Sequence, residues 1–156
     1  MKTETEIVIV AERPDTADAF ALVKELDEAL GAHYPVESRH GFSVDKLLQQ
    51  NVAFFVIRVD GRPAGCGGVQ ILAQDRYAEV KRMYVRPQFR GQQLAYRMLV
   101  HLADVARAAD VPVLRLETGI YQDAAIRLYE RFGFVQIPPF ADYFEDPLSL
   151  CYEMKL

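Results

Sequence analysis

Apolar residues recur along the chain with two spacings, and each spacing predicts a different element. Short β-branched and aromatic runs, closed by proline, glycine or polar turns, predict strands at 6–11, 51–59, 64–72 and 77–85. Apolar residues three and four positions apart predict helices at 16–30 and 43–50. The Asp60-Gly61 turn suits a tight hairpin, so residues 52–85 are expected to form an antiparallel meander.

The pattern changes after Val85. Leucine, methionine and valine at helical spacing predict a long helix from Leu94 to Ala109, followed by a strand at 113–118 and a helix at 122–131. A strand-helix-strand unit of this length favours two parallel strands joined by a right-handed crossover. Two short strands, 134–137 and 148–154, end the pattern. The chain is therefore expected to have an α/β fold with a mixed sheet.

Length and composition limit the classes of protein to be considered. The chain has 156 residues, 51% hydrophobic and 26% charged, which fits one globular domain over residues 1–156. A net charge of −4 gives no overall attraction to nucleic acid or to an anionic membrane. No apolar run approaches the ~20 residues of a membrane span, and no signal peptide is visible, so a cytoplasmic protein is expected. Cys66 and Cys151 lack metal-ligand spacing and predict two reduced core thiols, with no metal site.

The segment 79–95 places a strand end, a glycine-containing loop and a helix start in succession. Such a corner directs unpaired backbone N–H groups and the positive end of the helix dipole to one point, which suits an anion such as pyrophosphate. Gly91 allows close approach of the backbone, and Arg90 offers a guanidinium to a phosphate. The same corner also occurs in α/β proteins that bind nothing there, and no P-loop or dinucleotide-binding glycine motif is present.

Two blocks of sequence resemble the hallmarks of the GNAT superfamily of acetyl-CoA-dependent N-acetyltransferases. VKRMYVRPQFRGQQLAYRMLV resembles the acetyl-CoA signature R/Q-x-x-G-x-G/A after a V-x-P step: Arg90 and Ala95 match, whereas Gln93 replaces the usual glycine. LETGIYQDAAIRLYERFGFVQI resembles N-x-x-A-x-x-L-Y-x-x-x-G-F, with Gln122 in place of asparagine. The resemblance implies the GNAT fold, with about six to seven strands, about four helices and a splayed parallel strand pair at the acetyl-CoA site.

The resemblance also implies where acetyl-CoA binds. Met83, Tyr84 and Val85 lie on the strand whose backbone pairs with pantetheine in the family. Gln122 belongs to the second block and is expected to contact the same ligand. The pyrophosphate is expected at the loop and helix start formed by Arg90, Gly91, Gln92, Gln93, Leu94 and Ala95.

Two catalytic roles follow from the resemblance. Tyr129 matches the tyrosine that protonates the leaving thiolate, a transfer between a phenol of pKa about 10 and a thiol of pKa about 8.5. Glu79 stands where several members carry a general base, which an amine of pKa about 10.4 requires before it can attack. Glu117 on the neighbouring strand is the rival carboxylate, and an ion pair between Glu79 and Lys81 or Arg82 is the alternative for Glu79.

The acceptor site is less defined by sequence. Tyr34, Arg39, Tyr143 and Phe144 lie in loops that the family places around the acceptor, and Glu117 lies beside them. Three histidines have no partner at an informative spacing and are expected to be structural or on the surface: His33, His40 and His101.

The reaction expected is transfer of an acetyl group to a primary amine of a small molecule, by direct attack in a ternary complex. A catalytically silent acyl-CoA sensor and an acetyltransferase of protein amino groups are the alternatives. The resemblance to this family favours a homodimer as the oligomeric state.

Overall fold

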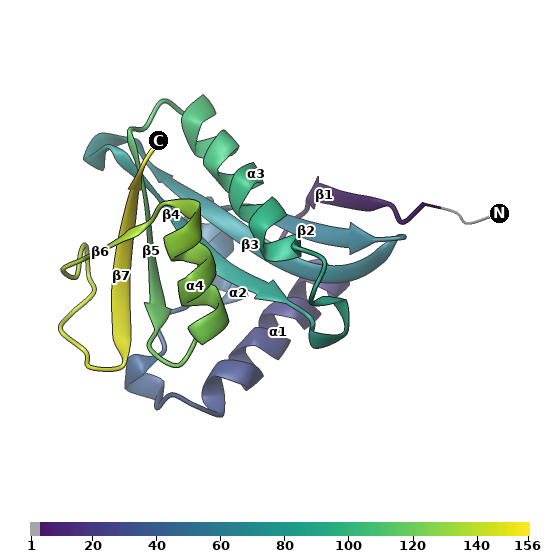
Figure 1. Cartoon of the computed structure of the whole chain (residues 1–156), viewed down its shortest axis with the longest axis horizontal. Coiled ribbons are helices and arrows are strands. Elements are labelled where there is room, and N and C mark those ends of the chain that lie inside the picture. Colours follow the sequence, from purple (N-terminus) through teal and green to yellow (C-terminus); the bar gives the residue numbers. More distant parts are fainter. Residues whose placement is uncertain (1–3) are drawn as a thin grey trace.

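The computed structural model describes residues 4–156 and has a seven-stranded sheet at its centre (Figure 1). In chain order the strands are β1 (Ile7–Ala11), β2 (Ala53–Val59), β3 (Arg62–Leu72), β4 (Tyr77–Val85), β5 (Val113–Gly119), β6 (Val135–Ile137) and β7 (Ser149–Lys155). Across the sheet they lie in the order β1-β2-β3-β4-β5-β7-β6. The β4–β5 pair is parallel and the other pairs are antiparallel, which confirms the predicted mixed sheet.

The predicted meander is confirmed in β2, β3 and β4. Asp60 and Gly61 join β2 to β3 with φ values of +49° and +80°. Two consecutive positive φ angles are what the tightest hairpin turn needs, and its twist matches that of the flanking strands. β1 pairs antiparallel with β2, although two helices separate these strands in the chain.

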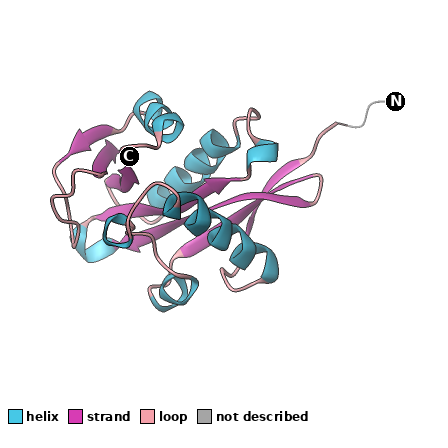
Figure 2. Cartoon of the chain, turned by 90° about the horizontal axis from the view of Figure 1, so that it is seen from below, coloured by secondary structure: helices cyan, strands magenta, loops and turns pink. Residues whose placement is uncertain are grey.

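Helices cover both faces of the sheet (Figure 2). They are α1 (Ala17–Gly31), α2 (Val44–Gln49), α3 (Leu94–Ala108) and α4 (Asp123–Phe132), with short 3-10 turns at Val36–Ser38, Ala73–Asp75 and Pro87–Phe89. Thr16 and Ser43 cap α1 and α2, because their hydroxyls accept from backbone N–H groups three residues later. The bounds of the four α-helices agree with those predicted from the sequence to within one or two residues.

The apolar faces of these helices produce two cores. α3 and α4 pack on one face of the sheet, where Met98, Leu102 and Leu114 are fully buried. α1 and α2 pack on the other face around Leu22 and Leu47. The sheet is therefore the middle layer of three, and side chains that alternate along β4 and β5 enter one core or the other.

β4 and β5 separate along their length. Within residues 4–156 they pair only at Ala78–Leu114 and Glu79–Arg115. Beyond this point β4 keeps its pairing with β3, and β5 keeps its pairing with β7. Arg82 has a φ of +55° beside an irregularity in the β3–β4 register, so β4 bends where the two strands part. The expected splayed parallel pair is confirmed.

None of the described helices is long and apolar enough to cross a bilayer. In the same part of the chain, no group of histidine, cysteine and acidic side chains is arranged to hold a metal ion. Cys66 and Cys151 are both buried and free, as their spacing predicts.

Candidate functional site

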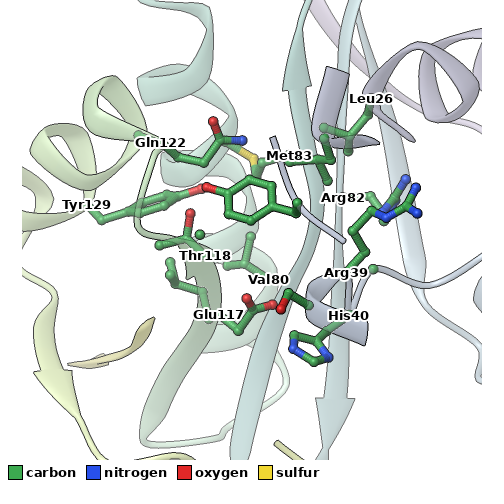
Figure 3. Close-up of a pocket in the computed structure, with 17 residues that line it drawn as sticks. Leu26, Arg39, His40, Val80, Arg82, Met83, Glu117, Thr118, Gln122 and Tyr129 are labelled. Atoms are coloured by element: carbon green, nitrogen blue, oxygen red, sulfur yellow. The ribbon is translucent and has the colours of Figure 1, made fainter. Parts of the chain in front are cut away.

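A pocket of about 130 Å³ opens where β4 and β5 part (Figure 3). Its walls come from α1 and the loop after it, from β4 and β5, and from α4. Six residues singled out in the sequence line it: Tyr34, Arg39, Met83, Glu117, Gln122 and Tyr129. Segments far apart in the chain therefore converge at this opening of the sheet.

Tyr129 reaches the pocket from α4. Its side chain points toward the space between the strands (Figure 3), and only 7% of the residue is exposed. The ring packs against Phe134 with centroids 5.8 Å apart. Burial raises the pKa of the Tyr129 phenol, with a smaller contribution from the charge of Glu117. The hydroxyl is therefore protonated at neutral pH, the form that donates a proton.

Glu117 lies on β5 and faces the same pocket. Ser149 donates a hydrogen bond of 2.9 Å to its carboxylate. Burial raises the pKa of Glu117; the bond from Ser149 and the charges of His40 and Lys81 oppose this rise, and the charge of Glu79 adds to it. A carboxyl group with a raised pKa is a stronger base once ionised, so Glu117 is suited to accepting a proton.

Glu79 lies on the same face of the sheet but does not line the pocket. It is 3% exposed and accepts a 2.8 Å bond from the ammonium of Lys81 and a second bond from the hydroxyl of Tyr143. Lys81 also lies 3.8 Å from the centroid of the Phe42 ring. The alternative of an ion pair with Lys81 is thus confirmed, although the pair is buried rather than on the surface.

Of two further predicted residues, Tyr34 forms part of the pocket wall and Tyr84 does not line the pocket. Tyr34 is buried, and its hydroxyl accepts a 2.9 Å bond from the backbone N–H of Tyr121. Gly119 allows this approach, because a Cβ there would lie 2.1 Å from the Tyr34 oxygen. Tyr84 directs its hydroxyl to Glu25 on α1, away from the pocket. Only the backbone of Tyr84 is thus available on the pocket side of β4.

The structure adds residues that sequence reasoning missed. His40 lines the pocket, and its Nε2 lies 3.6 Å from the carboxylate of Asp146. The rings of Tyr143 and Phe144 meet His40 edge-on, at centroid distances of 5.7 Å and 5.2 Å. Arg82 on β4 also lines the pocket. No sequence spacing could have paired His40 with Asp146, because the partners are distant in the chain.

The start of α3 has the features expected of an anion site. No side chain caps it, and its first turn contains no acidic residue. Gln93 precedes the helix in the left-handed conformation, with φ +59° and ψ +30°, and Gly91 has φ +84°. Arg90 is exposed and donates from Nε to the carbonyl of Val85 at 3.2 Å. The free N–H groups and the absence of competing negative charge fit a pyrophosphate.

Comparison with known proteins identifies the family. The model of the Acetyltransferase (GNAT) family matches residues 19–134. The chain belongs to this family. It is 42% identical to the IAA acetyltransferase of Azospirillum brasilense over 150 residues, which cover 96% of this chain and 98% of that protein. It is 33% identical to the uncharacterized N-acetyltransferase YsnE of Bacillus subtilis, over 87% of this chain and 91% of that protein.

Solved structures agree with this assignment. A Klebsiella pneumoniae protein assigned to the acyl-CoA N-acyltransferases superposes with a TM-score of 0.81 and 37% identity, over 96% of this chain and 97% of that one. The PaiA N-acetyltransferase of Thermoplasma acidophilum, solved with coenzyme A, shares the fold with a TM-score of 0.74 and 19% identity, over 99% of this chain and 100% of that one. The protein is thus a GNAT acyltransferase, and this family uses acetyl-CoA.

The conformation of Gln93 yields a stability prediction. Glycine, the usual residue of the family there, adopts this backbone conformation without the strain of a side chain. Gln93→Gly should raise the free energy of unfolding by up to about 1 kcal/mol in urea denaturation. Gln88→Gly is the matched control, because Gln88 has no positive φ and should lose stability. A destabilised Gln93→Gly would show that the glutamine side chain makes a contact that outweighs the strain.

Proposed function

We propose that this GNAT enzyme transfers the acetyl group of acetyl-CoA to a primary amine of a small molecule, by direct attack in a ternary complex. One observation carries the proposal: the pocket at the β4–β5 opening brings the phenol of Tyr129 and the carboxylate of Glu117 to one space (Figure 3). The volume of about 130 Å³ is below the roughly 300 to 1,000 Å³ of pockets that enclose a drug-sized ligand. This size favours a small acceptor.

Acetyl-CoA supplies an acyl thioester when it is bound. The backbone of Met83, Tyr84 and Val85 is free on the β5 side and offers hydrogen bonds to an extended ligand. The uncapped start of α3 with residues 90–95 would hold the pyrophosphate, and Arg90 would add a charged contact. Gln122 lines the pocket at the start of α4, from which it would contact the same ligand.

Tyr129 is the proposed acid of the reaction. Its hydroxyl is the proton source that would meet the thiolate sulfur as CoA leaves. The raised pKa keeps the proton on the phenol, but it also makes transfer to a thiolate more uphill. We therefore expect a contribution at the low end of the ~10² to 10⁴-fold that general acids provide.

Glu117 is the proposed base, acting directly or through a water. The amine must lose a proton before it attacks, and Glu117 is the carboxylate that lines the pocket. Glu79 stays the alternative base from the sequence, but both of its bonding partners hold it outside the pocket. The bond from Tyr143 instead supports a structural role for Glu79, because it joins β4 to the loop before β7.

Removal of the phenol hydroxyl tests the acid. Tyr129→Phe keeps the ring and its packing, so stability should change by less than about 1 kcal/mol while turnover falls by about 10². The measurement is CoA release in single-turnover kinetics, where chemistry limits the rate. Tyr152→Phe is the matched control: Tyr152 is also buried, but it lies on β7 outside the pocket. Wild-type turnover in Tyr129→Phe would eliminate the acid assignment.

The pH dependence tests the base. Because the pKa of Glu117 is raised, kcat/KM should increase with pH through a pKa above that of an ordinary glutamate, 4.5. Glu117→Gln should lower turnover and remove this rise of kcat/KM at acidic pH, the acidic limb of the profile. Glu79→Gln is the control: it should keep the limb while losing about 3 to 5 kcal/mol of stability, because it leaves the charge of Lys81 buried and unpaired. A limb that disappears in Glu79→Gln instead would assign the base to Glu79.

Stability gives a second readout for Glu117. Its folded-state pKa exceeds the unfolded value of 4.5, so the folded protein binds the proton more tightly and wild-type stability falls as pH rises through both values. Glu117→Gln removes this loss. The variant should therefore gain stability relative to the wild type as pH rises from below 4.5 through the raised pKa, and no gain would show that the pKa of Glu117 is not raised by folding.

A thiol-release screen tests the proposed function as a whole. Purified protein is given acetyl-CoA with small-molecule amines, or with peptides that carry free amino groups. Release of CoA with small amines supports the proposal. Release with peptides alone would favour an acetyltransferase of protein amino groups, and acetyl-CoA binding by calorimetry without any release would indicate a sensor.

A further inference from the structure

Two arginines line the pocket on the side away from Tyr129. Arg39 follows the 3-10 turn after α1, and Arg82 occupies the bend of β4. Figure 3 shows both across the pocket from Tyr129, with Glu117 below them on the side of His40. We propose that the acceptor amine carries a carboxylate and that Arg39 and Arg82 bind it, an inference that rests on the proposed acetyl transfer at this pocket.

The charge of Arg39 is not neutralised by its surroundings. Within residues 4–156, Arg39 forms no ion pair, whereas other arginines, such as Arg58 and Arg86, are paired with acidic side chains. Arg39 is exposed and lines the pocket mouth, so a ligand reaches it without rearrangement of the core. Its guanidinium lies near Gly31 at the end of α1, at 3.3 Å from the position a Cβ would take. Arg39 therefore presents a free cation to the acceptor site.

Arg82 adds a second cation that is almost fully buried. Its side chain is 3% exposed, and its Nη2 donates to the carbonyl of Val23 at 3.4 Å and to the carboxylate of Asp27. Its Nε is buried and has no hydrogen-bond partner among the residues that the structure describes. Asp27, whose side chain is 59% exposed, pairs with Nη2, so the Nε–H is the donor that Arg82 can still offer to a ligand.

Apart from the arginines and the tyrosines, the titratable side chains that line the pocket are His40 and Glu117. His40 lies beside Asp146, with its Nε2 3.6 Å from the carboxylate. Glu117 remains as the carboxylate that faces an incoming amine. A molecule with an amine and a carboxylate matches this separation of charge, since its amine meets Glu117 and its carboxylate meets the guanidinium groups.

The same arrangement disfavours other acceptors. A polyamine would place further positive charges beside two arginines, and like charges in a partly buried site repel each other. A neutral amine would leave the arginines without a partner. The acceptor is thus an amino carboxylate, for example an amino acid, rather than a simple amine or a polyamine.

The test compares matched acceptors. L-Amino acids are assayed beside the amines that lack the carboxylate and beside the corresponding methyl esters, with CoA release as the readout. We expect kcat/KM to be about 10- to 100-fold higher for the carboxylates, the range of a charge-assisted hydrogen bond. In Arg39→Ala this ratio should fall toward one through a higher KM for the carboxylate, and Arg39→Lys should recover part of it.

Arg107→Ala is the control variant, because Arg107 is exposed and pairs with Asp104 on α3, outside the pocket. It should keep the wild-type ratio. Amines or esters that react as well as the amino carboxylates would overturn the inference while leaving acetyl transfer intact, as would an unchanged ratio in Arg39→Ala. Absence of CoA release with every member of the panel would overturn the proposed function, and this inference with it.

Discussion

β4 and β5 pair through Ala78–Leu114 and Glu79–Arg115 and then part, and the position of the site depends on this separation. Each strand is held on its outer side along its length, β4 by β3 and β5 by β7, so neither can bend back to close the opening. The positive φ of Arg82 fixes the bend of β4 at the same level. A sheet that stayed paired would bury these backbone groups and leave no space between α1 and α4.

Two groups of polar side chains lie beside the opening, on the face of the sheet that α1 and α2 cover. Lys81, Glu79 and Tyr143 form one hydrogen-bonded group, and His40 and Asp146 form a second contact between the loop after α1 and the loop before β7. Removing one member of the Glu79–Lys81 pair leaves the other charge buried without a partner, which costs several kcal/mol. These contacts therefore fix the loops beside the pocket, and they leave Glu117 as the carboxylate that lines it.

The signature at α3 shows how local backbone geometry explains a departure from the family pattern. Gln93 takes the left-handed conformation that the usual glycine would take, so the turn into the helix is kept although the side chain differs. The turn itself, rather than the residue, directs the first N–H groups of α3 to one point. The substitution thus changes strain in the loop more than it changes the shape of the turn that leads into α3.

The sequence by itself determined the elements, the meander, the mixed sheet and the placement of Tyr129 on α4, because each depends on spacing within a short segment. Only the tertiary structure showed that Glu117 lines the pocket whereas Glu79 does not. Both lie on the same face of neighbouring strands, and their difference comes from Tyr143 and Ser149, which follow much later in the chain. The contact of His40 with Asp146, and the lack of an ion pair at Arg39 within residues 4–156, were likewise decided by packing between distant segments, for which periodicity along the chain holds no information.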